Sequence, residues 1–261
     1  MNFETLNVTL INDVLDIQLD RPERLNAINV TMLAELRQVF EGFGEQARAI
    51  MLRGNERAFC AGQDLKSVGQ GEDGAQMDVQ RLIEDHYNPL IRLIAATPRP
   101  VVASVRGVAA GAGCSLSLAA DIVVASETAS FDEAFVRIGL IPDCGASYVL
   151  PRLVGQARAT AMLMLGEAID GKTAAEWGLI WKAVPEGEVE EVASSIATKL
   201  AKSPSKAVGL IKGALRHSAS ATLDSQLDHE RDGQLAASKT EDFAEGLVAF
   251  AEKRPPVFLG K

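Results

Sequence analysis

The first half of the chain changes from an alternating pattern of apolar and polar residues to a helical one. Residues 6–20 alternate around Asn12 and Asp13, which predicts a hairpin of two half-buried strands. Residues 30–43 carry apolar side chains three and four positions apart, which predicts a helix, and residues 49–52 are apolar throughout, as in a buried strand. We also expect one long amphipathic helix over residues 77–96.

The stretch from residue 99 to 151 organises the rest of the chain. Apolar runs at 101–105 and 122–125 flank a turn rich in glycine and alanine at 107–113, which leads into a helix of small residues. A glycine-rich turn that opens a helix exposes backbone N–H groups. Such donors bind either a phosphate or the oxygen of a polarised carbonyl, and the pattern alone leaves both alternatives open.

Helical patterns dominate the last part of the chain. After short helices at 155–165 and 173–177 and a strand at 179–184, with Trp177 and Trp181 expected in the core, four helical segments follow, at 192–201, 204–217, 222–235 and 241–253. The prediction is therefore an α/β core over residues 1–187 and a helical region over residues 188–261. The helical region either caps the core or contacts other subunits.

Composition narrows the classes of function. The formal net charge of −9 argues against general nucleic-acid binding, although a local basic entrance can still bind an anionic small molecule. The 3 cysteines and 3 histidines show no ligand spacing, so we expect no metal site. The sequence starts without a basic, apolar signal region, and no uncharged run is as long as a membrane span, which favours the cytoplasm.

Several side chains of the 99–151 stretch are candidates for chemistry. Asp143 lies between Pro142 and Cys144, and a carboxylate in such an apolar loop is costly unless it is paired or functional. A turn-forming Asp after Pro is the alternative. Ser115 lacks the G-x-S-x-G context of a nucleophile and is interpreted as a packing residue, and the acids at 132 and 133 are interpreted as surface charges.

Four separated motifs then agree: RPERLNAIN, AFCAGQDL, GVAAGAGCSLSLAADI and FVRIGLIPDCGAS. Together they resemble the crotonase (enoyl-CoA hydratase/isomerase) superfamily over essentially the whole chain. The resemblance implies a spiral core of ββα units, a helical C-terminal trimerisation region, and a homotrimer or homohexamer. It also implies an acyl-CoA thioester as substrate, with coenzyme A as part of that substrate and no separate cofactor.

The resemblance also implies roles for individual residues. The backbone N–H groups of Gln63 and Ala112 would form an oxyanion hole for the thioester enolate, where one such donor is typically worth ~3 kcal/mol. Lys66 would be a further cation near the phosphates of coenzyme A. The substrate site would otherwise be lined by Arg24, Leu25, Ala27, Ala61, Asp64, Leu65, Gly111 and, from the tail, Lys253.

The catalytic acids favour an isomerase. Ser115 and Phe135 stand where hydratases of the family carry two glutamates, and Asp143 stands where several isomerases carry an acid that can move a proton between carbons. Among the isomerases, the resemblance is strongest to those of phenylacetate degradation, which convert the ring 1,2-epoxide of phenylacetyl-CoA to an oxepin and also shift 3-enoyl double bonds to the 2-position. A 2-enoyl-CoA hydratase that uses an inward-facing Glu133 is the first alternative. A non-catalytic subunit that binds acyl-CoA is the second.

Overall fold

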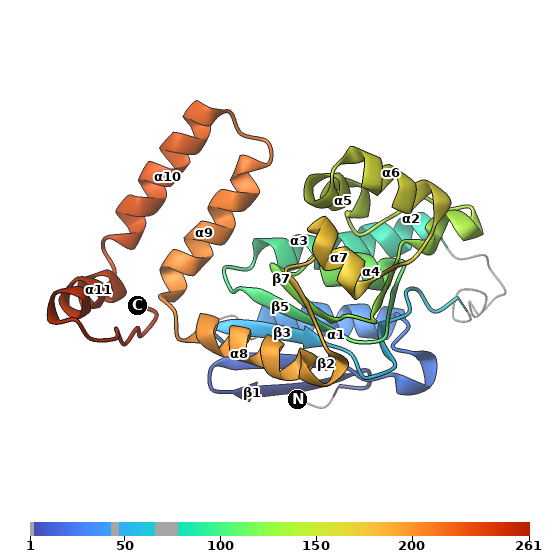
Figure 1. Cartoon of the computed structure of the whole chain (residues 1–261), viewed down its shortest axis with the longest axis horizontal. Helices are drawn as coiled ribbons and strands as arrows, with labels where there is room; N and C mark the ends of the chain where they lie inside the picture. The colour runs from blue at the N-terminus through green and yellow to red at the C-terminus, as the bar shows by residue number, and fades with distance from the viewer. Residues whose placement is uncertain (1–2, 43–46, 66–77) are drawn as a thin grey trace.

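The computed structural model describes residues 3–42, 47–65 and 78–261, which form two sheets surrounded by helices (Figure 1). The predicted hairpin is confirmed: β1 and β2 pair antiparallel, and Asn12 and Asp13 between them have φ values of 51° and 62°, as a tight hairpin turn requires. The other neighbours in the larger sheet are parallel. In spatial order its strands are β1 (Leu6–Ile11), β2 (Val14–Leu19), β3 (Ala49–Arg53), β5 (Val101–Val105), β7 (Ile122–Ser126) and β10 (Lys182–Val184).

A second, smaller sheet consists of strands of only two or three residues. Periodicity cannot identify such short strands, and the sequence analysis left them in loops. Three of them follow directly on β3, β5 and β7, and helical segments come next in each case, so the chain repeats a ββα unit as the resemblance implied. In spatial order the small sheet is β4 (Ala58–Cys60), β6 (Val108–Ala110), β8 (Ser130–Asp132) and β9 (Ile169–Asp170).

Most of the predicted helices are present. The segment expected as one helix at 77–96 is interrupted by a π-helical turn, while Met77 lies outside the described residues. The helix α5, over Ala146–Val154, was not predicted, because Pro151 within it argues against a helix. The helices around the two sheets are α1 (Val30–Gly42), α2 (Val79–Leu82), the π-helix η2 (Ile83–Tyr87), α3 (Asn88–Ala96), α4 (Ala112–Leu118), α5, α6 (Gln156–Leu165) and α7 (Gly171–Trp177), with 3-10 turns η1 (Pro22–Arg24), η3 (Ala134–Ile138) and η4 (Glu186–Glu188).

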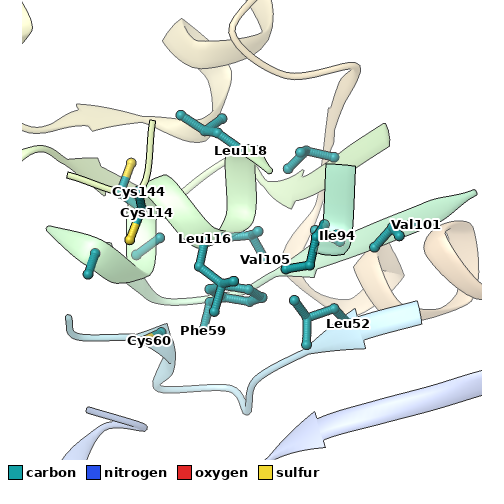
Figure 2. Close-up of a cluster of buried hydrophobic side chains, with 14 of the residues drawn as sticks. Leu52, Phe59, Cys60, Ile94, Val101, Val105, Cys114, Leu116, Leu118 and Cys144 are labelled. Carbon is teal, nitrogen blue, oxygen red and sulfur yellow. The ribbon is translucent and has the colours of Figure 1, made fainter. Parts of the chain in front are cut away.

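The main core lies between the larger sheet, the smaller sheet and helices α1, α3 and α4. Figure 2 shows its centre, where Phe59 of β4 packs near Leu116 of α4, with Leu52 and Val105 of the large sheet alongside. Phe59 is fully buried, and burying a side chain of this size contributes roughly 2–3 kcal/mol. Because β4 and α4 share this core, their relative position is fixed, and both lead to the site described below.

The opposite face of the large sheet is covered by α8 (Val189–Ala201). Its alanines at 193, 197 and 201 recur every fourth residue and therefore lie on one face of the helix. They pack against apolar side chains of the sheet, including Ala49, Met51 and Val102. The small alanine side chains let the helix approach the sheet closely.

The last three helices, α9 (Ser205–Ser218), α10 (Leu223–Ala237) and α11 (Glu241–Glu252), extend away from the core (Figure 1). Trp177 packs partly buried against the core, but the expectation for Trp181 is wrong, since it is 72% exposed after the helix that Trp177 ends. No helix among the described residues is long and apolar enough to cross a membrane. The projecting helices expose Ile211, Leu215, Leu223, Leu227, Leu235, Phe243, Leu247 and Phe250.

Candidate active site

Two parallel strands of the small sheet, β4 and β6, end side by side, and both run into turns that line one cavity. Only glycine fits where these turns cross. A Cβ on Gly62 would lie 2.7 Å from the carbonyl oxygen of Ala110, and a Cβ on Gly113 would lie 2.3 Å from that of Cys60. The glycines therefore permit a backbone approach that brings residue 63 next to residue 112.

The turns present two backbone N–H groups without partners. Ala112 is the first residue of α4, so its N–H has no carbonyl within the helix. Ile28 and Gln63 form a parallel bridge. The N–H of Ile28 donates to the carbonyl of Gly62 at 2.7 Å, and the N–H of Asp64 donates to the carbonyl of Ile28 at 2.8 Å. The N–H of Gln63 takes no part in the bridge. Within the described ranges, neither N–H has a hydrogen-bond acceptor, and both residues line the cavity. Such a pair can stabilise a negative oxygen.

The predicted coenzyme A loop is attached to the same turn. The buried amide of Asn26 donates to the carbonyls of Ala58 (3.0 Å) and Phe59 (3.2 Å), and Leu25 accepts a bond from the N–H of Ala61 (3.0 Å). Leu25 and Asn26 have φ values of 51° and 54°, so the loop is sharply turned. The structure therefore brings Arg24, Leu25 and Ala27 together with the segment from Ala61 to Leu65.

The charged residues predicted to bind substrate have different surroundings. Arg24 is exposed beside this loop, whereas the carboxylate of Asp64 is buried and pairs with Arg21 at 3.0 Å. Lys66 lies outside the described residues. Lys253 lies at the end of α11, far from the cavity within one chain (Figure 1).

The cavity has a volume of about 270 Å³ and a mostly apolar wall. Among its described lining residues, Asp143 carries the carboxyl group, and Arg137 is already bound to Asp132 at 2.8 Å and to the carbonyl of Gly166. Phe135 is almost fully buried in the wall. The residues that line the cavity are Ala61, Gly62, Gln63, Leu65, Val79, Leu82, Ile83, Tyr87, Ala110, Gly111, Ala112, Ala134, Phe135, Arg137, Ile138, Leu140 and Asp143.

Asp143 is an incompletely satisfied carboxylate. Its Oδ1 is buried and has no hydrogen-bond partner among the described residues. Burial raises the pKa of the Asp143 carboxyl above its ordinary value, and hydrogen bonds from the Cys144 thiol and from the backbone oppose the rise. Cys144 has a φ of 52° in the turn that leads to α5, and this turn places Asp143 at the cavity wall. A carboxylate in this condition can accept and return a proton.

The surface interpretation of the acids at 132 and 133 is wrong for Glu133, which is 0% exposed. The hydroxyl of Ser115 lies 3.3 Å from each of its carboxylate oxygens. Burial raises the pKa of Glu133 to about 8; hydrogen bonds from Cys114 and Ser115 lower it, and the charges of Asp143 and Asp132 raise it further. The second acid is thus inside the protein, in contact with Ser115, and neither residue is among those that line the cavity.

Tyr87 is a site residue that the sequence analysis did not single out. It is 3% exposed, lines the cavity, and donates a hydrogen bond of 2.6 Å to Oε1 of Gln63. It ends the π-helical turn, in which the N–H of Asn88 bonds to the carbonyl of Ile83. Pro89 follows and has no N–H to donate, which favours the interruption. Helical periodicity predicts burial of Tyr87, but not the wider turn that aims its hydroxyl.

Comparisons with known proteins agree with this geometry. A family model described as enoyl-CoA hydratase/isomerase matches residues 10–261. The chain is 43% identical over 250 residues to the 1,2-epoxyphenylacetyl-CoA isomerase of Escherichia coli, covering 95% of each chain. It is 42% identical over 262 residues, covering 100% of each, to a Rhodobacter capsulatus protein named "Probable enoyl-CoA hydratase". A crystal structure of an enoyl-CoA hydratase from Bacillus anthracis superimposes with a TM-score of 0.92 at 33% identity, covering 99% of this chain and 100% of that one.

The chain therefore belongs to the enoyl-CoA hydratase/isomerase family and has the crotonase fold. It is an enzyme of that family, whose members include both hydratases and isomerases. Which of the two reactions it performs depends on the acids in the cavity.

Proposed function

We propose that this protein is an acyl-CoA isomerase in which Asp143 carries the proton. The observation behind the proposal is the distribution of acids. Asp143 lines the cavity with one oxygen atom unpaired, while Ser115 and Phe135 occupy the two positions at which hydratases hold a water molecule between glutamates. In the part of the wall that the structure describes, one carboxylate among apolar side chains suits transfer of a proton within the substrate and offers no second acid to hold water.

The proposed reaction has two steps. The thioester carbonyl oxygen accepts hydrogen bonds from the N–H groups of Gln63 and Ala112. The Asp143 carboxylate then removes a proton from the α-carbon of a 3-enoyl thioester, and the electron pair moves onto the carbonyl oxygen as a dienolate. In the second step the same carboxyl returns the proton to the γ-carbon, which leaves the double bond between the α- and β-carbons. No atom is gained or lost.

The acyl group we propose is the ring 1,2-epoxide of phenylacetyl-CoA, converted to the oxepin thioester, with 3-enoyl thioesters as further substrates. The 43% identity to the E. coli isomerase of that name supports this choice. We further propose that no additional cofactor takes part, because coenzyme A arrives with the substrate. Arg24 at the entrance would face the phosphates of coenzyme A.

We also propose that the protein is a homotrimer or a homohexamer. The apolar side chains that α9, α10 and α11 expose support this, since helices that extend from a core with uncovered leucines need a partner surface. In such an assembly the tail of a neighbouring chain could bring Lys253 toward the site, which its position in one chain does not.

The test compares wild type with Asp143→Asn on a 3-enoyl-CoA and a 2-enoyl-CoA in heavy water. Mass spectrometry follows deuterium incorporation and addition of water. We expect wild type to shift the double bond and incorporate deuterium, and the variant to lose both while it still binds the thioester. The epoxide is then the next substrate to try. Equal isomerisation by both proteins would overturn the proposal.

A second candidate is 2-enoyl-CoA hydration with Glu133 as the acid. The observation in its favour is the 3.3 Å contact between Glu133 and Ser115, which places a carboxyl group behind the position of the first hydratase glutamate. Rapid, saturable addition of water to crotonyl-CoA that Glu133→Gln abolishes would establish it.

A further inference from the structure

The side chain of Gln63 is held in one orientation at the cavity wall. The hydroxyl of Tyr87 donates to its Oε1 at 2.6 Å, and both side chains line the cavity. This contact uses the side chain of Gln63, whereas the proposed binding of the thioester oxygen uses its backbone N–H. The side chain can therefore have a role of its own. Since the carboxamide is planar, fixing Oε1 toward Tyr87 also fixes the direction of Nε2.

The arrangement leaves a hydrogen-bond donor unused. The Nε2 atom of Gln63 carries two N–H groups, and in the described part of the chain neither has a partner. The neighbouring wall is apolar, formed by residues such as Leu82, Ile83 and Leu140. Of the other charged groups in the described wall, Arg137 is itself a donor and is bound to Asp132, and Asp143 forms no hydrogen bond with Nε2.

We propose that the Gln63 carboxamide, oriented by Tyr87, donates a hydrogen bond to an ether-type oxygen in the acyl group, so that the cavity selects oxygen-containing acyl rings over all-carbon ones. This inference rests on the proposed function, since an epoxide or an oxepin ring carries such an oxygen. A hydrocarbon acyl group would displace water from Nε2 and leave the donor unsatisfied. Pockets built to hydrogen-bond a substrate atom discriminate strongly against analogues that lack it.

Tyr87 acts in this scheme as a positioning residue. Its hydroxyl donates to Gln63, and burial raises the pKa of the phenol well above its ordinary value, so it stays protonated and a donor at neutral pH. Without it the amide could rotate and present Oε1 to the substrate oxygen, and two acceptors would then face each other.

The test uses two saturated thioesters of equal size, (tetrahydropyran-2-yl)acetyl-CoA and cyclohexylacetyl-CoA, which differ by one oxygen atom in place of a CH₂ group next to the ring carbon that carries the side chain. Their affinities are measured by calorimetry with the full-length protein. We expect wild type to prefer the oxygen-containing thioester by roughly five- to tenfold. We expect Gln63→Leu to abolish the preference and Tyr87→Phe, which keeps the ring, to reduce it to about twofold or less.

The ratio of the two affinities within each variant is the readout, so a general loss of binding cancels. Ile83→Val is the matched control, because it changes the wall without touching a polar group, and it should keep the preference. Wild type without a preference, or Gln63→Leu with the full preference, would overturn the inference. The proposed function is judged separately by the deuterium assay: isomerisation without an oxygen preference would refute only the inference, and a preference without isomerisation would refute only the proposed function.

Discussion

Glu133 makes the stability of this protein depend on pH in a way that one substitution can remove. Its carboxyl group is fully buried and accepts hydrogen bonds from Ser115 and Cys114, and no cation of the described residues pairs with it. The pKa of Glu133 in the folded protein is raised from 4.5 to about 8. Between those two values the unfolded chain releases the proton and the folded protein retains it. Stability must therefore fall as the pH rises through this window.

The size of the effect follows from the two pKa values. The difference between 4.5 and about 8 corresponds to about 5 kcal/mol once the pH exceeds both. At pH 7 the unfolded carboxyl is ionised and the folded one is mostly protonated, which leaves about 3 kcal/mol of this destabilisation in place. Below pH 4.5 both states are protonated and the contribution disappears.

Glu133→Gln keeps the shape and an acceptor for Ser115 but cannot ionise. We expect the free energy of unfolding of wild type to decrease by about 3 kcal/mol more than that of the variant between pH 4.5 and pH 7. Burial raises the pKa of Asp143 as well, so Asp143 acts in the same direction in both proteins, and only its interaction with the charge of Glu133 differs between them. The amide of the variant leaves one buried N–H without an acceptor, which lowers the free energy of unfolding by roughly 1–3 kcal/mol at every pH. This cost shifts the curve of unfolding free energy against pH but does not change its slope.

Urea unfolding at fixed protein concentration, repeated from pH 4.5 to pH 8.5, measures this difference. Glu127→Gln is the matched control, because it removes an exposed carboxylate instead of a buried one. Curves for wild type and Glu133→Gln that stay parallel to within about 1 kcal/mol would refute the reasoning. That result would mean that water or a rearrangement solvates the carboxylate in the folded protein.

Three further predictions concern the scaffold of the site. Gly113→Ala places a methyl group 2.3 Å from the carbonyl of Cys60, so β4 and α4 must separate. We expect kcat/KM on a 3-enoyl-CoA to fall about 100-fold. The control Gly233→Ala, whose added methyl group has nothing within 4 Å, should leave kcat/KM unchanged. Asn26→Ala removes the amide bound to two buried carbonyls and should lower the free energy of unfolding by roughly 2–4 kcal/mol in urea titrations. Arg48→Met removes three hydrogen bonds that hold Ser203, Ser205 and the carbonyl at residue 258, and should make the C-terminal segment sensitive to limited proteolysis; a segment as resistant as in wild type would contradict this.

Hydrophobic periodicity predicted the strands and helices that bury one complete face of apolar side chains. The hairpin, α1 and the helices from residue 189 onward follow from it, because each has enough residues to repeat a pattern. The small sheet does not follow, since β4 and β6 contain three residues each and owe their pairing to the chain around them. The helix α5 was missed because Pro151 is tolerated within it, a case in which tertiary packing overrides local preference.

The residues of the site also divide into those that the sequence predicted and those that it did not. The oxyanion positions Gln63 and Ala112 came from the resemblance to the family, whereas Asp143 was a candidate already from its apolar turn, and the structure places all three around one cavity. The surface interpretation of Glu133 failed because it considered composition and not alternation. Phe131 and Glu133 are fully buried while Asp132 between them is not, which is the two-residue period of a strand. The contact of Tyr87 with Gln63 joins residues 24 positions apart and depends on a π-helical turn.

The two buried acids also bear on the choice between isomerisation and hydration. A general base must be ionised at working pH and must reach the substrate. With a pKa of about 8, Glu133 is mostly protonated at pH 7, and it is fully buried and not among the residues that form the cavity wall. Asp143 lies on that wall with a free oxygen atom. Burial is the main cause of the raised pKa of Glu133, and ionisation of Asp143 raises it further, so an ionised Asp143, as the proposed base, is accompanied by a neutral Glu133. The pair thus favours a single proton carrier over two cooperating acids.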